Sequence, residues 1–491
     1  MTDLVVVSFR GPVEHGRDQD GRVAKGAAAG GLVTGLLALP AFEDRGAWVC
    51  AAMTDEDREV AHEGPTTVEV RGRKVAVRMV ALDPQAQHQT SAVAANPVLW
   101  FLQHELWDLG RNPTFARDEH EAFAGYAAVN AAFGDAVVHE LDARGDDTVV
   151  MLHDYHLYLV AAHVRERRPD AFLHHFVHIP WPPPEIWRTL PSALAELLLR
   201  GLLANDVVAF HTEGYVRNFL DTCEQVLSLP VDRDAGVVFV DGRQCAVRWY
   251  PISLDPDSLR ELAAGSEVRA ERRALQVNRP ERLVVRVDRA DPSKNVIRGF
   301  WALDQLFVDH PELLGRVTML ALVQPTRQDV AIYRDYLAEI RRTGQELVER
   351  YATEDWTPLD LWIGESLPKA VAAYQEADVV LVNPVRDGMN LVAKESVLLN
   401  ERDAVLVLSH QAGVFEEIGA FALGVHPLDV MEQADALHRA LLMPFEERRA
   451  RLNASRAVVE RNDAGRWLEQ QLQDVDQIRS LRAVDPRTGE E

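Results

Sequence analysis

The 491-residue sequence contains few cysteines and few lysines. Its three cysteines are widely spaced and form no C-x-x-C pair, so the sequence predicts neither a cysteine zinc site nor a disulfide framework. We interpret them as buried thiols in a reducing cytoplasm. Only five of the 52 basic residues are lysines, and this scarcity favours a functional role for a lysine that falls inside a motif. The cysteines are Cys50, Cys223 and Cys245; the lysines are Lys25, Lys74, Lys294, Lys369 and Lys394.

Long apolar runs and an excess of positive charge are also absent. No apolar run reaches the roughly 18 residues of a membrane span. The segment Met1–Val7 has no basic residues ahead of its apolar ones, so we expect no signal peptide. The formal net charge of −24 argues against a nucleic-acid or membrane-surface partner, since both require a basic face. We therefore expect a cytoplasmic protein.

Length and composition indicate a folded, multidomain protein. Hydrophobic residues make up 47% of the chain and charged residues 26%, which is ordinary for a globular enzyme. Because single cores rarely exceed about 250–300 residues, we expect two or three domains. Short β-branched runs alternate with stretches of helical periodicity, which predicts an α/β fold with doubly wound parallel sheets.

The predicted strands share a continuous apolar character: Leu4–Val7, Val149–Leu152, Ala171–Val177, Val207–Phe210, Leu283–Val287, Thr318–Val323, Leu359–Ile363, Val379–Val382 and Ala404–Leu408. The clearest predicted helices are Leu157–Arg167, Leu194–Leu203 and Val330–Tyr351.

A polar, helix-like stretch over residues 252–282 separates two strand-rich halves. We expect an N-terminal Rossmann-like domain over 1–251, a C-terminal one over 252–465, and a terminal amphipathic helix with an acidic tail over 466–491. Two facing Rossmann-like domains would place a ligand cleft between them, at the carboxyl ends of the strands. Residues 13–29 are rich in glycine and alanine, and we expect a mobile loop there.

Two segments of the C-terminal half suit phosphate chemistry. Arg289 and Lys294 follow a predicted strand, and two cations at such a place suit a diphosphate, although a plain surface loop is an even alternative. Further on, Asp387 and Gly388 precede a helix that contains Glu395. Its first turn offers backbone N–H groups to phosphate, and the two carboxylates could bind sugar hydroxyls. A capped helix with Asp387 as the N-cap is the alternative.

Three segments of the N-terminal half also follow strands or open helices. The sequence His153-Asp154-Tyr155-His156 follows one strand, and His178-Ile179-Pro180-Trp181 follows the next. A metal site at His174 and His178 is rejected, because residues four apart on a strand are about 13 Å apart. Arg10 follows the first strand, and Gly30-Gly31 resembles a turn that lets backbone approach a phosphate, which is a weak signal alone.

Taken in order, these segments resemble the trehalose-6-phosphate synthase family of retaining glycosyltransferases, which have two Rossmann-like domains in the GT-B architecture. The resemblance runs from about residue 4 to about residue 480. Its most specific part is the string Arg386-Asp387-Gly388-Met389-Asn390-Leu391-Val392-Ala393-Lys394-Glu395. Further matches are Asn96-x-x-Leu99-Trp100 and the segments named above. The arginine-rich composition and the form Arg-x-x-x-Ser-Lys-Asn look actinobacterial.

The resemblance implies retaining transfer of glucose from UDP- or GDP-glucose to glucose 6-phosphate, with no cofactor, no metal and no covalent protein nucleophile. It implies small-molecule partners only, and leaves a homo-oligomer open. It also implies a role for each matching residue. The catalytic set would be Arg289 and Lys294 on the donor diphosphate, His178 on the donor hexose and Asp154 on the acceptor. The donor would further be bound by Gly31, Asp387, Gly388, Met389, Asn390, Leu391, Val392 and, at the ribose, Glu395. The acceptor phosphate would be held by Arg10, Trp100 and Arg327.

The sequence departs from the family pattern on the acceptor side. Ser91 stands where the family usually has a tyrosine, and Phe9 precedes Arg10 where the family usually has asparagine. Related pseudoglycosyltransferases, the validoxylamine-phosphate synthases, also lack that tyrosine and share Asn400–Ala404 and Glu432–Ala434 with this chain. They alter the 386–395 string and His156, which this chain keeps. A non-catalytic sugar-phosphate-binding regulator is a second alternative, against which the intact donor-side residues count.

Overall fold

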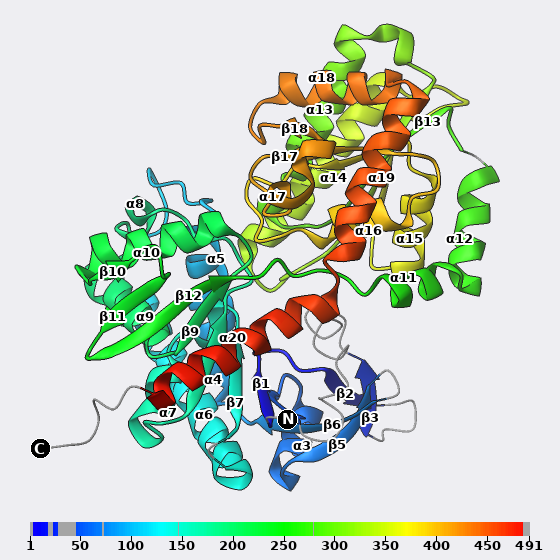
Figure 1. Ribbon diagram of the computed structural model, residues 1–491. Helices are drawn as coiled ribbons and strands as arrows, with labels where there is room; N and C mark the ends of the chain where they lie inside the picture. The colour runs from blue at the N-terminus through cyan, green and yellow to red at the C-terminus, as the bar shows by residue number, and fades with distance from the viewer. Residues whose placement is uncertain are drawn as a thin grey trace, which may run out of the picture. The chain divides into compact units, whose positions relative to one another are not determined.

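The computed structural model describes residues 3–17, 23–27, 46–70, 73–145, 147–277 and 279–484. The chain forms two compact units (Figure 1). Unit 1 comprises Met1–Ile252 together with Ala464–Glu491, and unit 2 comprises Ser253–Asp463. The polypeptide therefore leaves unit 1 once and returns to it for its last helix, α20 (Ala464–Val484). Among the described residues, no helix combines the length and apolar character needed to cross a membrane.

Unit 1 is built on a mainly parallel sheet. In the described part of the chain it has ten strands in the order β10-β11-β12-β9-β8-β7-β1-β4-β6-β5. Strands from β12 to β6 pair in parallel, while β5, β11 and β10 add antiparallel edges. Its strands are β1 (Leu4–Val7), β4 (Gly46–Ala51), β5 (Thr66–Val70), β6 (Arg73–Val80), β7 (Val149–His153), β8 (Phe172–Phe176), β9 (Val207–Phe210), β10 (Val231–Asp232), β11 (Val237–Val240) and β12 (Arg243–Trp249).

Helices connect these strands and cover the sheet. Every residue of β1, β4, β7, β8 and β9 is buried, as expected for parallel strands covered on both faces. One apolar cluster joins the central strands to α6 and α7. The helices of unit 1 besides α20 are α3 (Asp55–Glu63), α4 (Pro84–Gln89), η1 (Thr90–Leu99), α5 (Trp100–Gln103), α6 (Arg117–Arg144), η2 (Tyr155–Leu157), α7 (Val160–Arg167), α8 (Pro184–Trp187), α9 (Ser192–Leu203) and α10 (Glu213–Leu227).

Unit 2 is a doubly wound domain with a fully parallel sheet. Among the described residues the strand order is β15-β14-β13-β16-β17-β18. The chain starts at the central strand β13, extends to β15, and then returns to β16 on the other side of β13. Ligands of such sheets bind at this point of reversal, outside the carboxyl ends of the strands. The strands are β13 (Arg282–Arg289), β14 (Val317–Gln324), β15 (Leu359–Ile363), β16 (Val379–Val382), β17 (Val405–Ser409) and β18 (Leu423–Val425).

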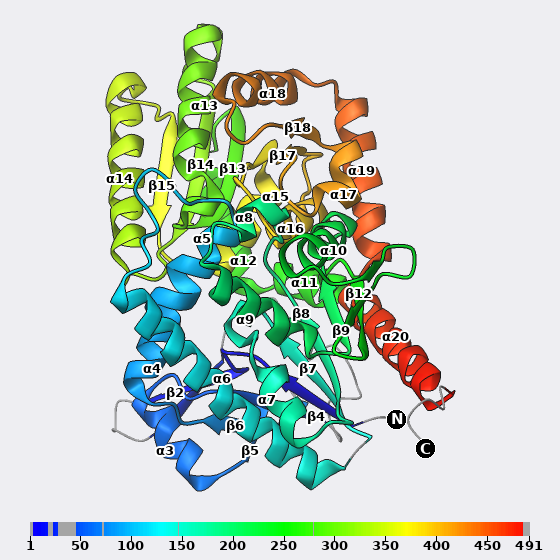
Figure 2. The same cartoon turned by 90° about the vertical axis from the view of Figure 1, so that its left-hand side faces the viewer.

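Helices lie on both faces of this sheet (Figures 1 and 2). Those that share a core with the strands on one face are α13, α14 and α18, whereas α15 and α16 contact β13 and β16. The helices of unit 2 are α11 (Pro256–Ala263), α12 (Ser266–Val277), η3 (Pro292–Lys294), α13 (Val296–Asp309), η4 (Pro311–Leu313), α14 (Ala331–Tyr351), α15 (Leu367–Glu376), α16 (Leu391–Leu399), α17 (Phe415–Ile418), η5 (Gly419–Phe421), α18 (Val430–Leu442) and α19 (Phe445–Arg461).

The prediction of a mobile loop over residues 13–29 is wrong for the described residues of that range. β2 (Val13–Arg17) and β3 (Val23–Ala27) form an antiparallel pair, so their backbone groups are satisfied by a hairpin. The backbone N–H of His15 donates to Oδ1 of Asp57 at 2.9 Å, and the His15 ring contacts the same oxygen at 2.8 Å. This buried contact fastens β2 to α3. Gly30, Gly31, Leu32 and the acidic tail over 485–491 lie outside the described residues.

Candidate active site

The loop after β13 is held by a buried arginine. Arg286 has no exposed surface, and its guanidinium binds Oδ2 of Asp288 at 2.8 Å. It also donates to the carbonyl oxygens of Val296 and Lys294, each at 3.1 Å. Desolvation raises the pKa of Asp288, although the nearby charges of Arg286 and Lys294 act to lower it. The backbone on both sides of Lys294 is thereby fixed by the core of the sheet. Arg289, the last residue of β13, stands at its carboxyl end.

The loops after β13 and β16 are joined to each other. The Nζ atom of Lys294 forms an ion pair with Oδ2 of Asp387. The backbone N–H of Val385 donates to the carbonyl of Ser293 at 2.8 Å, and the Asn295 amide donates to the carbonyl of Asn383 at 2.9 Å. Because β13 and β16 flank the point where strand order reverses, these bonds join the two loops into one surface there, which we call the loop surface. Two of the most specific predicted segments therefore meet in space.

The start of α16 lies beside this ion pair, and its N-cap is Asn390. Its side-chain Oδ1 accepts from the N–H of Ala393 at 3.0 Å, with a backbone φ of 82° that few non-glycine residues adopt. The alternative in which Asp387 is the N-cap is therefore wrong. Asp387 instead accepts from the Asn390 amide at 3.0 Å and binds Lys294. The first-turn N–H groups of Leu391 and Val392 begin a nine-residue helix whose positive dipole end points toward this surface.

Two neighbouring residues of α16 have different surroundings. Glu395 is half-buried, and burial raises the pKa of its carboxyl to about 7, while the Tyr374 hydroxyl donates to it at 3.3 Å. Lys394 is fully buried and forms an ion pair with Glu417 at 2.5 Å. Glu417 also accepts from the Asn462 amide at 3.0 Å, so this pair joins α16 to the segments that follow it. Of the two lysines in these segments, Lys394 therefore stabilises the core through its ion pair, and Lys294 lies at the loop surface.

Arg327 follows β14 and contacts the same loop system. Its backbone φ is 47°, and its Nη1 donates to Asp291 at 3.0 Å and to the Tyr333 hydroxyl at 2.9 Å. Its guanidinium carbon also lies 5.1 Å from the centroid of the Tyr333 ring. Asp291 in turn accepts from the N–H of Ser293 at 3.0 Å, which ties the β14 loop to η3. The guanidinium is thus oriented by a carboxylate and an aromatic ring.

In unit 1, the loops after the adjacent strands β7 and β8 bring Asp154 and His178 together. Asp154 has a φ of 74°, and its Oδ1 accepts from the N–H of His178 at 3.4 Å. Nε2 of His178 lies 3.1 Å from Nδ1 of His153, at hydrogen-bonding distance. Burial, reinforced by the neighbouring His211 and His153, holds the pKa of His178 well below its usual range. The ring is therefore neutral at pH 7 and can take part in hydrogen bonds without carrying charge.

The C-terminal helix contributes a ring to this site. Trp467, in the first turn of α20, is almost fully buried. Its ring centroid lies 5.3 Å from that of Phe176 and 6.3 Å from that of His178. The periodicity of the sequence shows a terminal amphipathic helix, but nothing in it shows that this helix contacts a segment almost 290 positions earlier. Sequence reasoning gave Trp467 no place in the site, and it named His153 within the segment after β7 without assigning it a role.

The predicted acceptor-phosphate residues of unit 1, Arg10 and Trp100, have different surroundings. Arg10 follows β1 and is exposed, and its carbonyl accepts from the Ser8 hydroxyl at 2.6 Å. Trp100 is buried in α5, with its ring centroid 5.6 Å from that of Tyr155. The Tyr155 hydroxyl donates to Oδ1 of Asn96 at 2.9 Å, which joins two predicted segments.

Ser91 and Phe9, the two departures from the family pattern, are both engaged within unit 1. The Ser91 hydroxyl donates to the carbonyl of Gln87 at 2.8 Å, one turn back in the same helical stretch. The Phe9 ring stacks on that of His156, with centroids 4.8 Å apart. Gly31, expected to approach the donor, lies outside the described residues.

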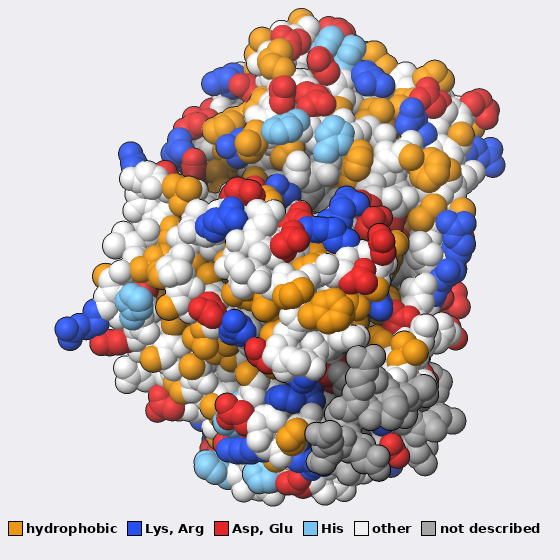
Figure 3. Space-filling view, turned by 60° about the vertical axis from the view of Figure 1, so that its left-hand side comes forward, with side chains coloured by type: hydrophobic (Ala, Val, Ile, Leu, Met, Phe, Trp, Pro, Cys, Tyr) orange, Lys and Arg blue, Asp and Glu red, His pale blue; other side chains and the backbone are white. Residues whose placement is uncertain are grey.

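The surface charges do not form a single basic patch on the face shown in Figure 3. Lys and Arg side chains there are interspersed with Asp and Glu. Many arginines are paired on the surface, as in Arg233 with Asp221 and Arg316 with Glu281. The positive side chains at the loop surface of unit 2 are thus a local feature in a chain of net charge −24.

Two units with largely parallel sheets, and in unit 2 cationic loops and a helix start at the point of strand reversal, fit the class of glycosyltransferases with the GT-B architecture. The comparison with known families agrees. The model of glycosyltransferase family 20 matches residues 2–477, and the chain belongs to that family. It is an enzyme similar to the trehalose-phosphate synthases.

Relatives of two activities resemble the chain over most of its length. A trehalose-6-phosphate synthase of Mycobacterium avium is 33% identical over 501 residues, which cover 99% of this chain and 97% of the relative. A validamine 7-phosphate valienyltransferase of Streptomyces hygroscopicus subsp. jinggangensis is 30% identical over 439 residues, covering 87% and 84%.

Solved structures also resemble the chain over nearly its whole length. An E. coli protein bound with UDP-2-fluoro glucose has a TM-score of 0.84 and 31% identity, covering 97% of this chain and 99% of that one. An α,α-trehalose-phosphate synthase of Burkholderia xenovorans in complex with glucose-6-phosphate has a TM-score of 0.81 and 29% identity, covering 96% and 100%.

Proposed function

We propose that this enzyme transfers glucose, with retention of configuration, from a nucleoside diphosphate glucose to glucose 6-phosphate, giving trehalose 6-phosphate. The observation that carries the proposal is the ion pair of Lys294 and Asp387 beside the start of α16. It sets a cation, a carboxylate and free helix N–H groups side by side at the point of strand reversal. These are the groups that a sugar linked to a diphosphate requires.

The donor is assigned to unit 2. Arg289 and Lys294 would bind the diphosphate, and the backbone of Gly388, Met389, Asn390, Leu391 and Val392 would bind phosphate and sugar oxygens. Cleavage of the bond between the sugar and the phosphate increases the negative charge on the leaving diphosphate. Cations and N–H groups already fixed in place stabilise that charge without reorganisation. Asp387 would accept from a donor hydroxyl while it orients Lys294, and Glu395 would bind the ribose. The donors proposed are UDP-glucose and GDP-glucose.

The acceptor is assigned to Arg10, Trp100 and Arg327 at its phosphate and to Asp154 at its hydroxyls. Asp154 is held in an uncommon backbone conformation and bonded to the loop of His178, which favours a fixed orientation. The neutral His178 would donate to or accept from the donor hexose. The reaction proposed needs neither a pair of catalytic carboxylates nor a protein nucleophile, because the leaving phosphate takes the proton of the attacking hydroxyl. It also uses no cofactor.

Incubation with glucose 6-phosphate and either UDP-glucose or GDP-glucose tests the proposal. We expect release of the nucleoside diphosphate and formation of a non-reducing disaccharide phosphate whose two anomeric carbons are both α by NMR. Omission of the acceptor is the control for hydrolysis of the donor. Absence of transfer from both donors would refute the proposal, and nucleotide binding without transfer would favour a non-catalytic sugar-phosphate-binding regulator.

A second candidate is the coupling of a nucleotide-activated cyclitol to an aminocyclitol phosphate. Two observations favour it: Ser91 bonds to its own helix, and a valienyltransferase is 30% identical over 87% of this chain. The same assay with a nucleoside diphosphate cyclitol as donor and validamine 7-phosphate as acceptor separates the candidates. Higher kcat/KM with this pair than with a nucleoside diphosphate glucose and glucose 6-phosphate would establish the second function in place of the first.

A further inference from the structure

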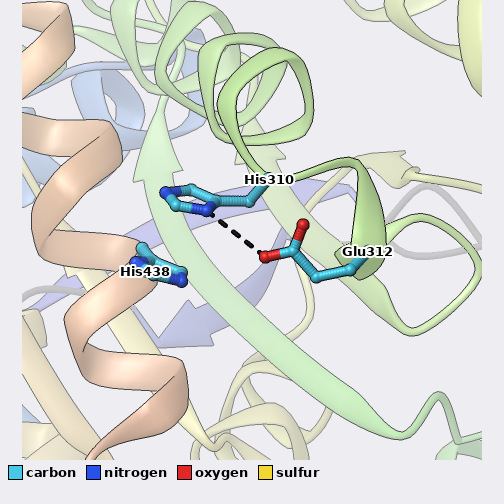
Figure 4. Close-up of side chains that lie close together, drawn as sticks. All are labelled: His310, Glu312 and His438. Atoms are coloured by element: carbon cyan, nitrogen blue, oxygen red, sulfur yellow. Dashed lines mark ion pairs between the residues drawn. The ribbon is translucent and has the colours of Figure 1, made fainter.

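A second cluster of polar side chains in unit 2 lies away from the loops after β13 and β16. His310 directly follows α13, Glu312 lies in η4, and His438 lies in α18 (Figure 4). Helix α13 begins at Val296, beside the Lys294 loop, and its 14 residues span about 21 Å at 1.5 Å per residue. The cluster is therefore at the opposite end of α13 from the donor residues, and the proposed transfer does not use it.

The three side chains converge. Nδ1 of His310 lies 3.3 Å from Oε1 of Glu312, as drawn in Figure 4. The rings of His310 and His438 are stacked, with centroids 3.4 Å apart and planes inclined by 10°. One donor atom can be chosen from each residue such that all three lie within 4.8 Å of one another. Both histidines are half-buried and Glu312 is exposed, so the cluster is open to solvent on one side.

We propose that His310, Glu312 and His438 bind a divalent transition-metal ion, with zinc as the best match. Imidazole nitrogen and carboxylate oxygen both bind zinc at about 2.0–2.2 Å, and two such ligands at tetrahedral angles are about 3.3 Å apart. The distance between His310 and Glu312 has that value. Three protein ligands leave the fourth position of a tetrahedral ion to water. Borderline nitrogen ligands favour zinc, nickel or copper over magnesium and calcium, which prefer oxygen.

Binding requires one ring to turn. A histidine donates its lone pair in the plane of its ring, and two nearly parallel planes cannot both contain one ion. Rotation about χ2 of a histidine is soft, and the half exposure of both rings leaves space for it on the solvent side. Without an ion, the same contacts would do no more than join α13 to α18. Metal titration distinguishes these two roles.

The test uses the full-length enzyme after treatment with a chelator. Titration with Zn²⁺ by calorimetry is expected to show one ion per chain, and Co²⁺ is expected to give the visible absorption of a tetrahedral site. Glu312→Gln and His438→Ala should each weaken Zn²⁺ binding by about tenfold or more, as loss of a ligand does. His120→Ala, which removes an exposed histidine of α6 in unit 1, is the matched control and should bind as the wild type does.

The result that overturns the proposal is equal Zn²⁺ affinity in Glu312→Gln, His438→Ala and wild type, or no binding to the wild type at sub-millimolar Zn²⁺. If His438→Ala does not fold, Glu312→Gln decides alone, because its exposed side chain lies outside the core. Glycosyl transfer should be unchanged in Glu312→Gln, since the cluster lies at the far end of α13 from Lys294.

Discussion

Alanine at Gly299 is expected to destabilise unit 2 and to weaken donor binding through one local clash. Gly299 lies in the first turn of α13, against the buried guanidinium of Arg286. A Cβ atom at this position would lie 1.9 Å from Nη1 of Arg286, far inside van der Waals contact. That same Nη1 donates to the carbonyl of Val296 at 3.1 Å. The added methyl group must therefore displace the arginine that fixes the backbone of Lys294.

The magnitude follows from three opposing contributions. Loss of one hydrogen bond from a buried charged group costs about 1.5–3 kcal/mol. Strain from overpacking adds about 1–3 kcal/mol. The higher helix propensity of alanine offsets about 1 kcal/mol of this destabilisation. The net free energy of unfolding should fall by roughly 1.5–5 kcal/mol. The KM for the nucleotide sugar should rise with it, because the carbonyl of Lys294 accepts from the displaced guanidinium.

Urea unfolding followed by circular dichroism, together with donor saturation kinetics, measures both effects. Gly16→Ala, where a Cβ would meet nothing within 4 Å, is the control for adding a methyl group. In an Arg286→Met background the cost of Gly299→Ala should shrink toward the propensity gain, because the clashing atom is gone. A Gly299→Ala variant as stable as the wild type, or an unchanged cost in the Arg286→Met background, would refute the reasoning.

Four further changes test the assignments of single side chains. Lys294→Ala should lower kcat by on the order of 10²–10³ without changing thermal unfolding, because a cation on the leaving group is lost; near-normal turnover would contradict its role. Lys394→Met should instead lower stability to urea by about 3–5 kcal/mol, because it leaves the largely buried Glu417 carboxylate without its cation, with its hydrogen bond from Asn462 remaining; wild-type stability would show that the ion pair contributes nothing. Burial raises the pKa of Glu395 from 4.5 to about 7 in the folded protein, so the wild type loses stability as the pH rises between these two values and the carboxyl ionises. Glu395→Gln does not ionise and should therefore gain stability relative to the wild type as the pH rises from about 5 to about 8; a difference independent of pH would argue against the buried carboxyl. Trp467→Ala should lower kcat and shift its pH profile by loosening the ring of His178, and Trp467→Phe should restore both; failure of phenylalanine to rescue would show a role in folding alone.

Much of the fold is predictable because the buried parallel strands are local signals. Continuous apolar runs such as Leu4–Val7 and Val379–Val382 coincide with β1 and β16, and the helix predicted at Val330–Tyr351 begins one residue later as α14. Such strands are apolar on both faces, so neither register nor partner is needed to recognise them. The antiparallel strands β5, β10 and β11, whose residues are only partly buried, were missed, and β5 and β10 do not form a continuous apolar run.

The features that sequence reasoning missed depend on contacts over long separations or on side-chain direction. The hairpin of β2 and β3 is fastened by Asp57, 42 positions from His15. The N-cap at Asn390 requires a left-handed φ that no residue pattern specified. The scarcity of lysine singled out Lys294 and Lys394 alike, yet one lies at the loop surface and the other in the core. Composition identifies candidates, and only packing separates their roles.

The return of the chain to unit 1 for its last helix affects how the protein is made. The Tyr250 hydroxyl binds Asp474 at 2.6 Å, and Arg479 binds Asp147 at 3.2 Å, so α20 is fastened to residues synthesised long before it. At a translation rate of about 5–20 residues per second, the intervening segment takes roughly 10–40 s to emerge. Unit 2 is continuous and can fold during this delay, whereas the surface around Phe176 waits for Trp467. Unit 1 is thus the first unit to begin emerging from the ribosome and the last to be completed, and the ring of Phe176 lacks its contact with Trp467 until α20 has been synthesised.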